Sequence, residues 1–287
     1  MTTVPRSSAT NRFLARQLPL IIVSIVIVTL MVSPLMASFF ASIKSPSEAS
    51  SVPPTYFPSE FSIRNFQTVW DYGAGLLTYV RNSTFTAFFT IALCLGLSVP
   101  AGFALARFRI PFKEVWFLLI LASMMLPYQA LLTPLYIMFS ELKLTNSLFG
   151  LAIVHTILQL PFSTYIMRNA CEAIPREMEE AAMVEGATSL QILTRIFLPL
   201  IAPGMVTVAL FAFIMSWNEF IAALVFMSRE SAFTVPVMLT GVSTGMFGTI
   251  DWGALQASVL ISILPCVAIY LLLQRYYVSG LMSGAGK

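Results

Sequence analysis

The chain has 287 residues, of which 57% are hydrophobic and only 10% are charged, and its mean hydropathy is +0.84. A soluble domain carries about 25% charged residues, so this chain cannot cover the surface of a soluble enzyme. The net charge of +3 is too small to indicate a nucleic-acid partner. The composition therefore predicts an integral membrane protein surrounded by lipid.

Uncharged stretches long enough to cross a bilayer, roughly 20 residues, define the predicted membrane spans. Seven such stretches occur, at 17–43, 82–106, 115–140, 144–167, 196–218, 231–250 and 252–274. Ten of the twenty residues in 231–250 are Ser, Thr, Gly or Pro, so we exclude this stretch as a span. We therefore predict an all-α membrane protein with six transmembrane helices.

The order of these stretches predicts the organisation of the chain. The uncharged run of the first span is 27 residues long, against about 7–15 for the core of a signal peptide, so we expect a retained helix. The predicted segments are a cytoplasmic N-terminus at 1–17, a first span at 18–43, an exterior segment at 44–81, a transmembrane core at 82–275 that includes a polar cytoplasmic segment at 174–199, and a cytoplasmic tail at 276–287.

The distribution of charge predicts the orientation. With both termini in the cytoplasm, eleven Lys and Arg residues lie on the inner side and five on the outer side, in agreement with the positive-inside rule. On the outer side, Ile63, Phe66 and Trp70 recur at helical spacing. They predict a helix within 61–80 that lies on the outer membrane surface.

Residues that carry metal or catalytic chemistry are scarce. His155 is the single histidine, and Cys94, Cys171 and Cys266 have no ligand spacing, so we expect no metal site and no disulfide. A membrane protease or lipid transferase would need several His, Ser or Asp residues together within the spans. The terminal Gly284–Lys287 lacks the spacing of a phosphate-binding loop. We predict that the chain is not an enzyme and binds no cofactor of its own.

The segment 174–199 predicts a short cytoplasmic helix, a tight turn and a second helix. Pro175 suits the first turn, Gly186 suits the C-terminal stop, and Thr188 or Ser189 can cap the following helix. A capped helix joined rigidly to two spans is suited to push, or be pushed by, a partner, whereas the simpler interpretation is an ordinary re-entry loop. The acidic residues that complement its positive N-terminal dipole are Glu177, Glu179 and Glu180.

This segment resembles the EAA signature of permease subunits in binding-protein-dependent ABC importers. The match runs through Glu180-Ala181-Ala182, Gly186 and Ile196-Phe197-Leu198-Pro199. Other stretches, with less specific patterns, resemble the carbohydrate branch of these importers, specifically its shorter, six-span, maltose-transporter-like permease. These similarities lie at 82–83, 104–109, 125–127, 216–220 and 273–281, and the resemblance covers about residues 20–287.

The resemblance implies a set of partners and a location. Two permease subunits form the pathway as a heterodimer, two cytoplasmic ATPase subunits hold ATP and Mg and bind the EAA helices, and an extracytoplasmic binding protein delivers the solute. The chain is then expected in the bacterial inner membrane, carrying a sugar or sugar-like solute. The residues expected to couple it to the ATPase are Glu177, Glu179, Glu180, Ala181, Ala182, Gly186, Ile196, Leu198 and Pro199.

Polar side chains in the predicted spans are candidates for a solute pathway. Glu219 is the only acidic residue in an otherwise uncharged span, although its position also fits a solvated site at the outer interface. The alternative of a secondary transporter would use several such charges and often an internal repeat, and neither is present. The remaining candidates, which can also serve as helix-to-helix contacts, are Tyr128, Gln129, His155, Gln159, Trp217 and Asn218.

The excluded polar stretch lies within a 24-residue segment, 228–251, that is too long for a simple turn. We predict a loop that projects outward and contacts the binding protein. The glycines of this loop, which have no side chain, would allow close approach to a partner. The residues expected to make this contact are Thr240, Gly241, Gly245 and Gly248.

Overall fold

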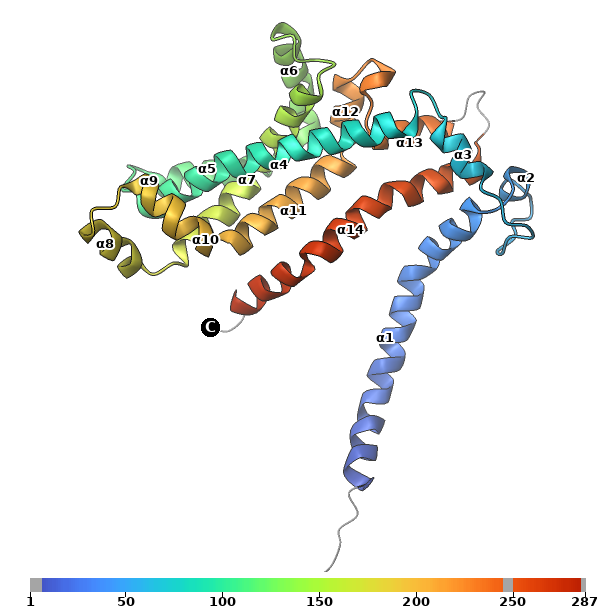
Figure 1. The fold of residues 1–287 in the computed structure, drawn as a ribbon, viewed down its shortest axis with the longest axis horizontal. Coiled ribbons are helices and arrows are strands. Elements are labelled where there is room, and N and C mark those ends of the chain that lie inside the picture. Colours follow the sequence, from blue (N-terminus) through green and yellow to red (C-terminus); the bar gives the residue numbers. More distant parts are fainter. Residues whose placement is uncertain (1–6, 245–249, 285–287) are drawn as a thin grey trace, which may run out of the picture.

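The computed structural model describes residues 7–244 and 250–284, and this part of the chain contains helices and no strands (Figure 1). Four helices are long and apolar enough to cross a membrane. They are α1 (Ser7–Ser42), α4 (Leu76–Arg107), α7 (Leu148–Glu172) and α14 (Trp252–Gly284). α14 continues to Gly284, so the helix extends beyond the predicted end of the last span at residue 275 into the stretch predicted as the cytoplasmic tail.

Two further spans are broken. α5 (Lys113–Ser123) and α6 (Tyr128–Glu141) meet at 96°, and Ser189–Leu200 meets α11 (Ala202–Asn218) at 76°. Pro127 stands at the N-cap of α6 and Pro203 in the first turn of α11, where a residue without an N–H does not interrupt the helix that follows. Six spans result when each bent pair counts as one, but the third and fifth spans are not the continuous helices that the uncharged stretches indicated.

The centre of the bundle is the crossing of α4 and α7, with α11 against both (Figure 1). At Gly102 on α4, a Cβ atom would come within 2.6 Å of the Cβ of Met167 and 2.7 Å of the backbone N of Arg168. Only glycine allows this approach of two helix backbones, which is a common device of membrane helix packing. The buried core beside this crossing includes Phe103 and Phe197.

α1 stands apart from this bundle and points away from it over most of its length (Figure 1). The most apolar window of Gln17–Ser42 is 0% buried within the chain, and its contacts are chiefly with α14. Leu20, Ile25 and Leu30 are among its exposed apolar residues. The surface of this apolar window is therefore available to lipid or to another chain.

The exterior segment contains α2 (Pro46–Ala49) and α3 (Arg64–Trp70). The Asn65 side chain donates hydrogen bonds of 2.8 Å to the carbonyls of Ser42 and Lys44, which fixes α3 to the end of α1. The backbone N–H and the hydroxyl of Ser59 lower the pKa of Glu48 by donating to its carboxylate. The predicted helix within 61–80 is thus shorter than expected, and its Asn65 and Val69 face inward.

The region after α11 differs most from its prediction. α12 (Ile221–Phe226) and a 3-10 turn (Glu230–Ala232) lead into α13 (Val235–Thr244), which packs against α4 and α14. Val235, Met238 and Val242 recur at helical spacing and are buried. The expected outward loop is therefore wrong for 235–244, because the apolar face decides the structure although half of the stretch is small or polar. Gly245 and Gly248 lie outside the described residues.

Gly241 offers a test of this packing, because it faces Tyr72 rather than a free surface. A Cβ atom at Gly241 would lie 2.7 Å from the Tyr72 hydroxyl oxygen and 3.5 Å from the ring carbon behind it. Burial raises the pKa of Tyr72, so its hydroxyl stays neutral there. Alanine exceeds glycine in helix propensity by about 1 kcal/mol, but here a clash with the hydroxyl opposes that gain.

We expect Gly241→Ala to stabilise the chain by about 1 kcal/mol in a Tyr72→Phe background and to lose that gain when Tyr72 is present. Thermal unfolding of the four combinations in detergent measures both effects. An equal effect of Gly241→Ala in the two backgrounds would show that α13 does not pack on Tyr72 in this way.

Candidate functional site

The segment 174–199 forms the helix, turn and helix that its residues predict. α8 (Arg176–Val184) begins after Pro175, and Gly186, at φ +82°, turns the chain away from it. The N–H of Ala187 donates to the carbonyl of Ala182 at 2.9 Å, which satisfies the end of α8. Thr188 then caps the next helix in a reciprocal capping box with Gln191. α8 lies at one end of the molecule, away from the spans (Figure 1).

The two faces of α8 have different surroundings. Only Glu179 and Ala182 are buried, while the predicted coupling residues Glu177, Glu180 and Ala181 are exposed. The predicted coupling residues Glu179 and Ala182 lie three residues apart on one side of the helix, and that side faces the bundle. The exposed side also carries Met183 and Val184, which are 51% and 89% exposed and are not among the predicted coupling residues. Apolar residues beside acidic ones on the exposed side of a short helix are a signal of a contact surface.

The second part of the segment leads back into the bundle. α9 (Ser189–Gln191) is followed by a π-helix at Ile192–Phe197 and by α10 (Leu198–Leu200). Ile196 and Leu198 are partly buried against the core beside the α4 and α7 crossing, and Pro199 is exposed. These predicted coupling residues therefore connect α8 to the spans.

A cavity of about 850 Å³ lies between α6, α7 and α11. Most of its wall is apolar and includes Met125, Phe162 and Phe211, and polar groups interrupt it at a few points. This composition is typical of small-molecule sites. Five of the seven residues predicted for the solute pathway line the cavity, namely Tyr128, Gln129, Gln159, Asn218 and Glu219.

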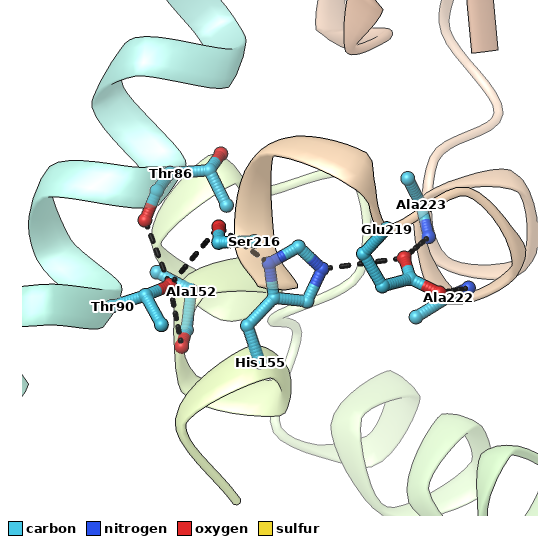
Figure 2. A network of polar contacts seen from close by, with 8 residues as sticks. All are labelled: Thr86, Thr90, Ala152, His155, Ser216, Glu219, Ala222 and Ala223. Atoms are coloured by element: carbon cyan, nitrogen blue, oxygen red, sulfur yellow. Dashed lines mark hydrogen bonds and ion pairs between the residues drawn. The ribbon is translucent and has the colours of Figure 1, made fainter. Parts of the chain in front are cut away.

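His155 lies behind Glu219, away from the cavity wall, and is fully buried (Figure 2). Its Nε2 atom is 3.3 Å from Oε2 of Glu219, and its Nδ1 atom is 2.8 Å from the hydroxyl of Ser216. The Ser216 hydroxyl also lies 3.4 Å from that of Thr90, which donates to the carbonyl of Thr86 at 2.8 Å. A chain of polar contacts thus joins α4, α7 and α11 behind the cavity.

Glu219 is only 8% exposed, so the expectation of a solvated site at the outer interface is wrong. Glu219 is buried because the chain breaks between α11 and α12. The two carboxylate oxygens of Glu219 accept hydrogen bonds from the backbone N–H groups of Ala222, at 2.7 Å, and Ala223, at 3.0 Å (Figure 2). These N–H groups at the start of α12 have no partner inside the helix, and the positive end of its dipole favours a carboxylate.

Trp217 is the other predicted pathway residue that does not line the cavity. It is 2% exposed, its indole Nε1 donates to the carbonyl of Ser262 at 3.0 Å, and its ring stacks on Phe213. It therefore joins α11 to α14 and does not line the cavity. The sequence does not single out Thr90 and Ser216 as members of the polar chain behind the cavity. Thr90 looks like an ordinary helix residue, and Ser216 lies in a stretch that carries the family resemblance but has no distinct signal for a contact with His155.

Comparisons with known proteins agree with this arrangement. Residues 98–282, more than half of the chain, match the family described as binding-protein-dependent transport system inner membrane component. The diacetylchitobiose uptake system permease protein DasC of Streptomyces coelicolor is 32% identical, over 90% of this chain and 92% of its own. The sulfoquinovosyl glycerol transport system permease protein SmoH of Agrobacterium fabrum is 32% identical over 100% of both chains.

A similar fold occurs in a solved structure. A chain of a bacterial ABC transporter involved in the import of the acidic polysaccharide alginate matches with a TM-score of 0.79 and 23% sequence identity, covering 96% of this chain and 100% of that one. The broken spans, the cavity and α8 thus belong to a multi-pass inner-membrane protein. The chain is a member of the family of binding-protein-dependent transport system inner membrane components.

Proposed function

We propose that this chain forms half of the translocation pathway of an ABC importer for a sugar or sugar-like solute. The observation that carries the proposal is that one chain holds both a cavity between its spans and a separate helix, α8, whose outer face is free for a partner. ATP hydrolysis in the partner subunits would move α8, and the spans joined to it would open and close the cavity.

The solute class rests on the relatives and on the lining of the cavity. Diacetylchitobiose, sulfoquinovosyl glycerol and alginate, named for the similar proteins, are all sugars or sugar derivatives. Sugars present hydroxyl groups around an apolar ring edge, and amide, phenol and carboxylate groups can bond to the hydroxyls while apolar walls cover the ring. We assign this contact to Gln159 and Asn218, with Tyr128, Gln129 and Glu219 beside them.

The partners follow from the surfaces that this chain leaves exposed. We place a pair of ATPase subunits, which hold ATP and Mg, on the outer face of α8 around Glu180 and Met183. We place a second permease subunit against the cavity and α1, since neither is closed by the chain itself. With both termini in the cytoplasm, α8 lies on the inner side and α3 and α13 on the outer side, where a solute-binding protein would dock.

The proposal is tested by uptake into liposomes that hold the complete complex. We expect uptake of a sugar from a panel of diacetylchitobiose, trehalose and maltose only when ATP, both ATPase subunits and the binding protein are present. Collapsing the ion gradients with an uncoupler should leave the rate unchanged. Uptake by the purified chain alone, or uptake that the uncoupler abolishes, would favour a secondary transporter.

A further inference from the structure

Arg107, the last residue of α4, lies where four elements meet. Its Nη2 atom donates to the carbonyl of Cys171 at 2.7 Å and to the carbonyl of Ile174, both at the C-terminal end of α7. A cation suits this position because the last carbonyls of a helix are unpaired and its dipole is negative there. The side chain of Arg107 is 3% exposed, so these bonds are shielded from water.

Beyond Ile174, the same guanidinium group contacts the segment 174–199 at two further places. Its central carbon lies 5.0 Å from the centre of the Phe197 ring, in the π-helix. Its Nε atom lies 3.6 Å from Oε2 of Glu179, on α8. One buried side chain therefore touches the end of α7, α8 and the π-helix while it is anchored on α4.

Little else joins α8 to the bundle. Its two buried residues are Glu179 and Ala182, and alanine contributes a single methyl group to the core. Among the described residues, the contact between Glu179 and Arg107 is the one side-chain ion pair or hydrogen bond between α8 and a span. Any displacement of α8 must therefore act on Arg107, on the Ala182 contact or on the backbone at its two ends.

The geometry of this contact leaves it free to change. At 3.6 Å the Nε atom and the carboxylate form an ion pair but not a hydrogen bond, and the Nε atom has no other partner in the described part of the chain. A buried charge that loses its partner is costly, so the guanidinium would follow Glu179 if α8 were displaced. Because its fork is rigid and its other arm holds two carbonyls, such a displacement would be passed to α7 and α4.

We propose that Arg107 is a positioning residue that transmits the displacement of α8 to the ends of α4 and α7. This inference rests on the proposed function, because it assumes that ATPase subunits move α8. It is separable from that function, since an importer whose α8 acts only through the backbone at its two ends would not depend on Arg107.

The chain offers a matched control in Arg168. This second buried arginine, on α7, has a side chain that is 8% exposed, binds Glu114 and Glu172 at 2.7 and 2.8 Å, and lies over the ring of Phe117. It contacts no residue of α8 by hydrogen bond or ion pair within the described chain. Arg168→Gln thus removes a comparable buried cation without touching the proposed connection.

The test follows movement rather than transport, so no solute needs to be known. The complete complex is prepared with Cys94, Cys171 and Cys266 replaced by serine and with Met125→Cys as a reporter, because Met125 lines the cavity. The measured quantities are the rate of labelling by a membrane-impermeant maleimide with and without ATP and vanadate, the ATPase subunits retained, and thermal stability. An absence of any ATP-dependent change in the parent complex would count against the proposed function itself.

We expect Arg107→Gln and Glu179→Gln each to reduce the ATP-dependent change in labelling at least fivefold while the ATPase subunits stay bound. The double variant should be no worse than either single one, because both remove the same connection. Arg168→Gln should keep the change even where it lowers stability, and Arg107→Lys, which keeps the charge but not the fork, should be intermediate. Should Arg107→Gln fail to assemble, Glu179→Gln decides alone. A normal change in Glu179→Gln, or an equal loss in Arg168→Gln, overturns the proposal.

Discussion

Gly186→Val is expected to reduce solute-stimulated ATP hydrolysis at least tenfold while leaving the bundle folded. Gly186 has φ +82°, and apart from Gly186 itself and its two chain neighbours no heavy atom of the described residues lies within 4 Å of the position that a Cβ atom would take. The cost therefore comes from the backbone alone, at about 1–3 kcal/mol for a residue held in a sparsely populated region. The turn can relieve this strain by changing the angle between α8 and α9, and that change moves α8 away from its partner.

Gly186→Asn is the matched control for this experiment. Asparagine adopts the left-handed region far more readily than valine, and the open space around Gly186 accommodates its side chain. We expect this variant to keep more than half of the stimulated rate. Hydrolysis in the reconstituted complex and the ATPase subunits retained on the membrane are measured for both variants. Normal stimulation with valine, or equal losses with valine and asparagine, would contradict a role for this backbone angle.

Glu219→Ala is expected to have the largest effect on stability, with a loss of about 3–5 kcal/mol, because it leaves buried partners without their carboxylate. Those partners are the N–H groups of Ala222 and Ala223 and the ring of His155. α12 loses the group that caps its first turn, and the wall of the cavity loses the connection between α11 and α12. We therefore expect a lower midpoint of thermal unfolding and little assembled complex.

Two variants separate this structural effect from a loss of solute contacts. Glu219→Gln keeps an oxygen that can accept a hydrogen bond from one of the two N–H groups, so this variant should lose about 1–2 kcal/mol of stability. Asn218→Ala removes a polar group from the same cavity. Within the described part of the chain its exposed side chain donates only to the carbonyl of Ile214 and to the sulfur of Cys266, so the loss of stability should stay within about 0.5 kcal/mol. Unfolding of the purified complexes measures all three, and a midpoint for Glu219→Ala no lower than that for Asn218→Ala would rule out the capping role.

The sequence predicts the membrane spans well, because a bilayer demands long uncharged stretches and little else satisfies that demand. It does not predict where a span is broken. The uncharged run 115–140 contains most of α5 and α6, and nothing in its charge marks the 96° bend before Tyr128. Proline alone does not reveal the break either, since α4 and α7 continue through Pro100 and Pro161.

In the candidate sites, too, the sequence predicts some features and not others. The turn at Gly186 and the cap at Thr188 are local, so residue types and spacing are enough to predict them. The burial of Glu219 depends on N–H groups freed by a nearby break, and the burial of Glu179 depends on Arg107, which is 72 positions earlier in the chain. Contacts of this kind follow only from the packing of the helices.

The isolation of α1 has a consequence for the amount of this protein in a cell. In the proposed complex a second permease subunit covers α1, because Gln17–Ser42 buries none of its most apolar window within the chain, and the packing energy of this helix is then gained on assembly. The stability of the subunit is then linked by mass action to the concentration of that partner. Copies made in excess of the partner would stay in the less stable form and be cleared by proteolysis, so the lifetime of this chain should rise and fall with partner expression.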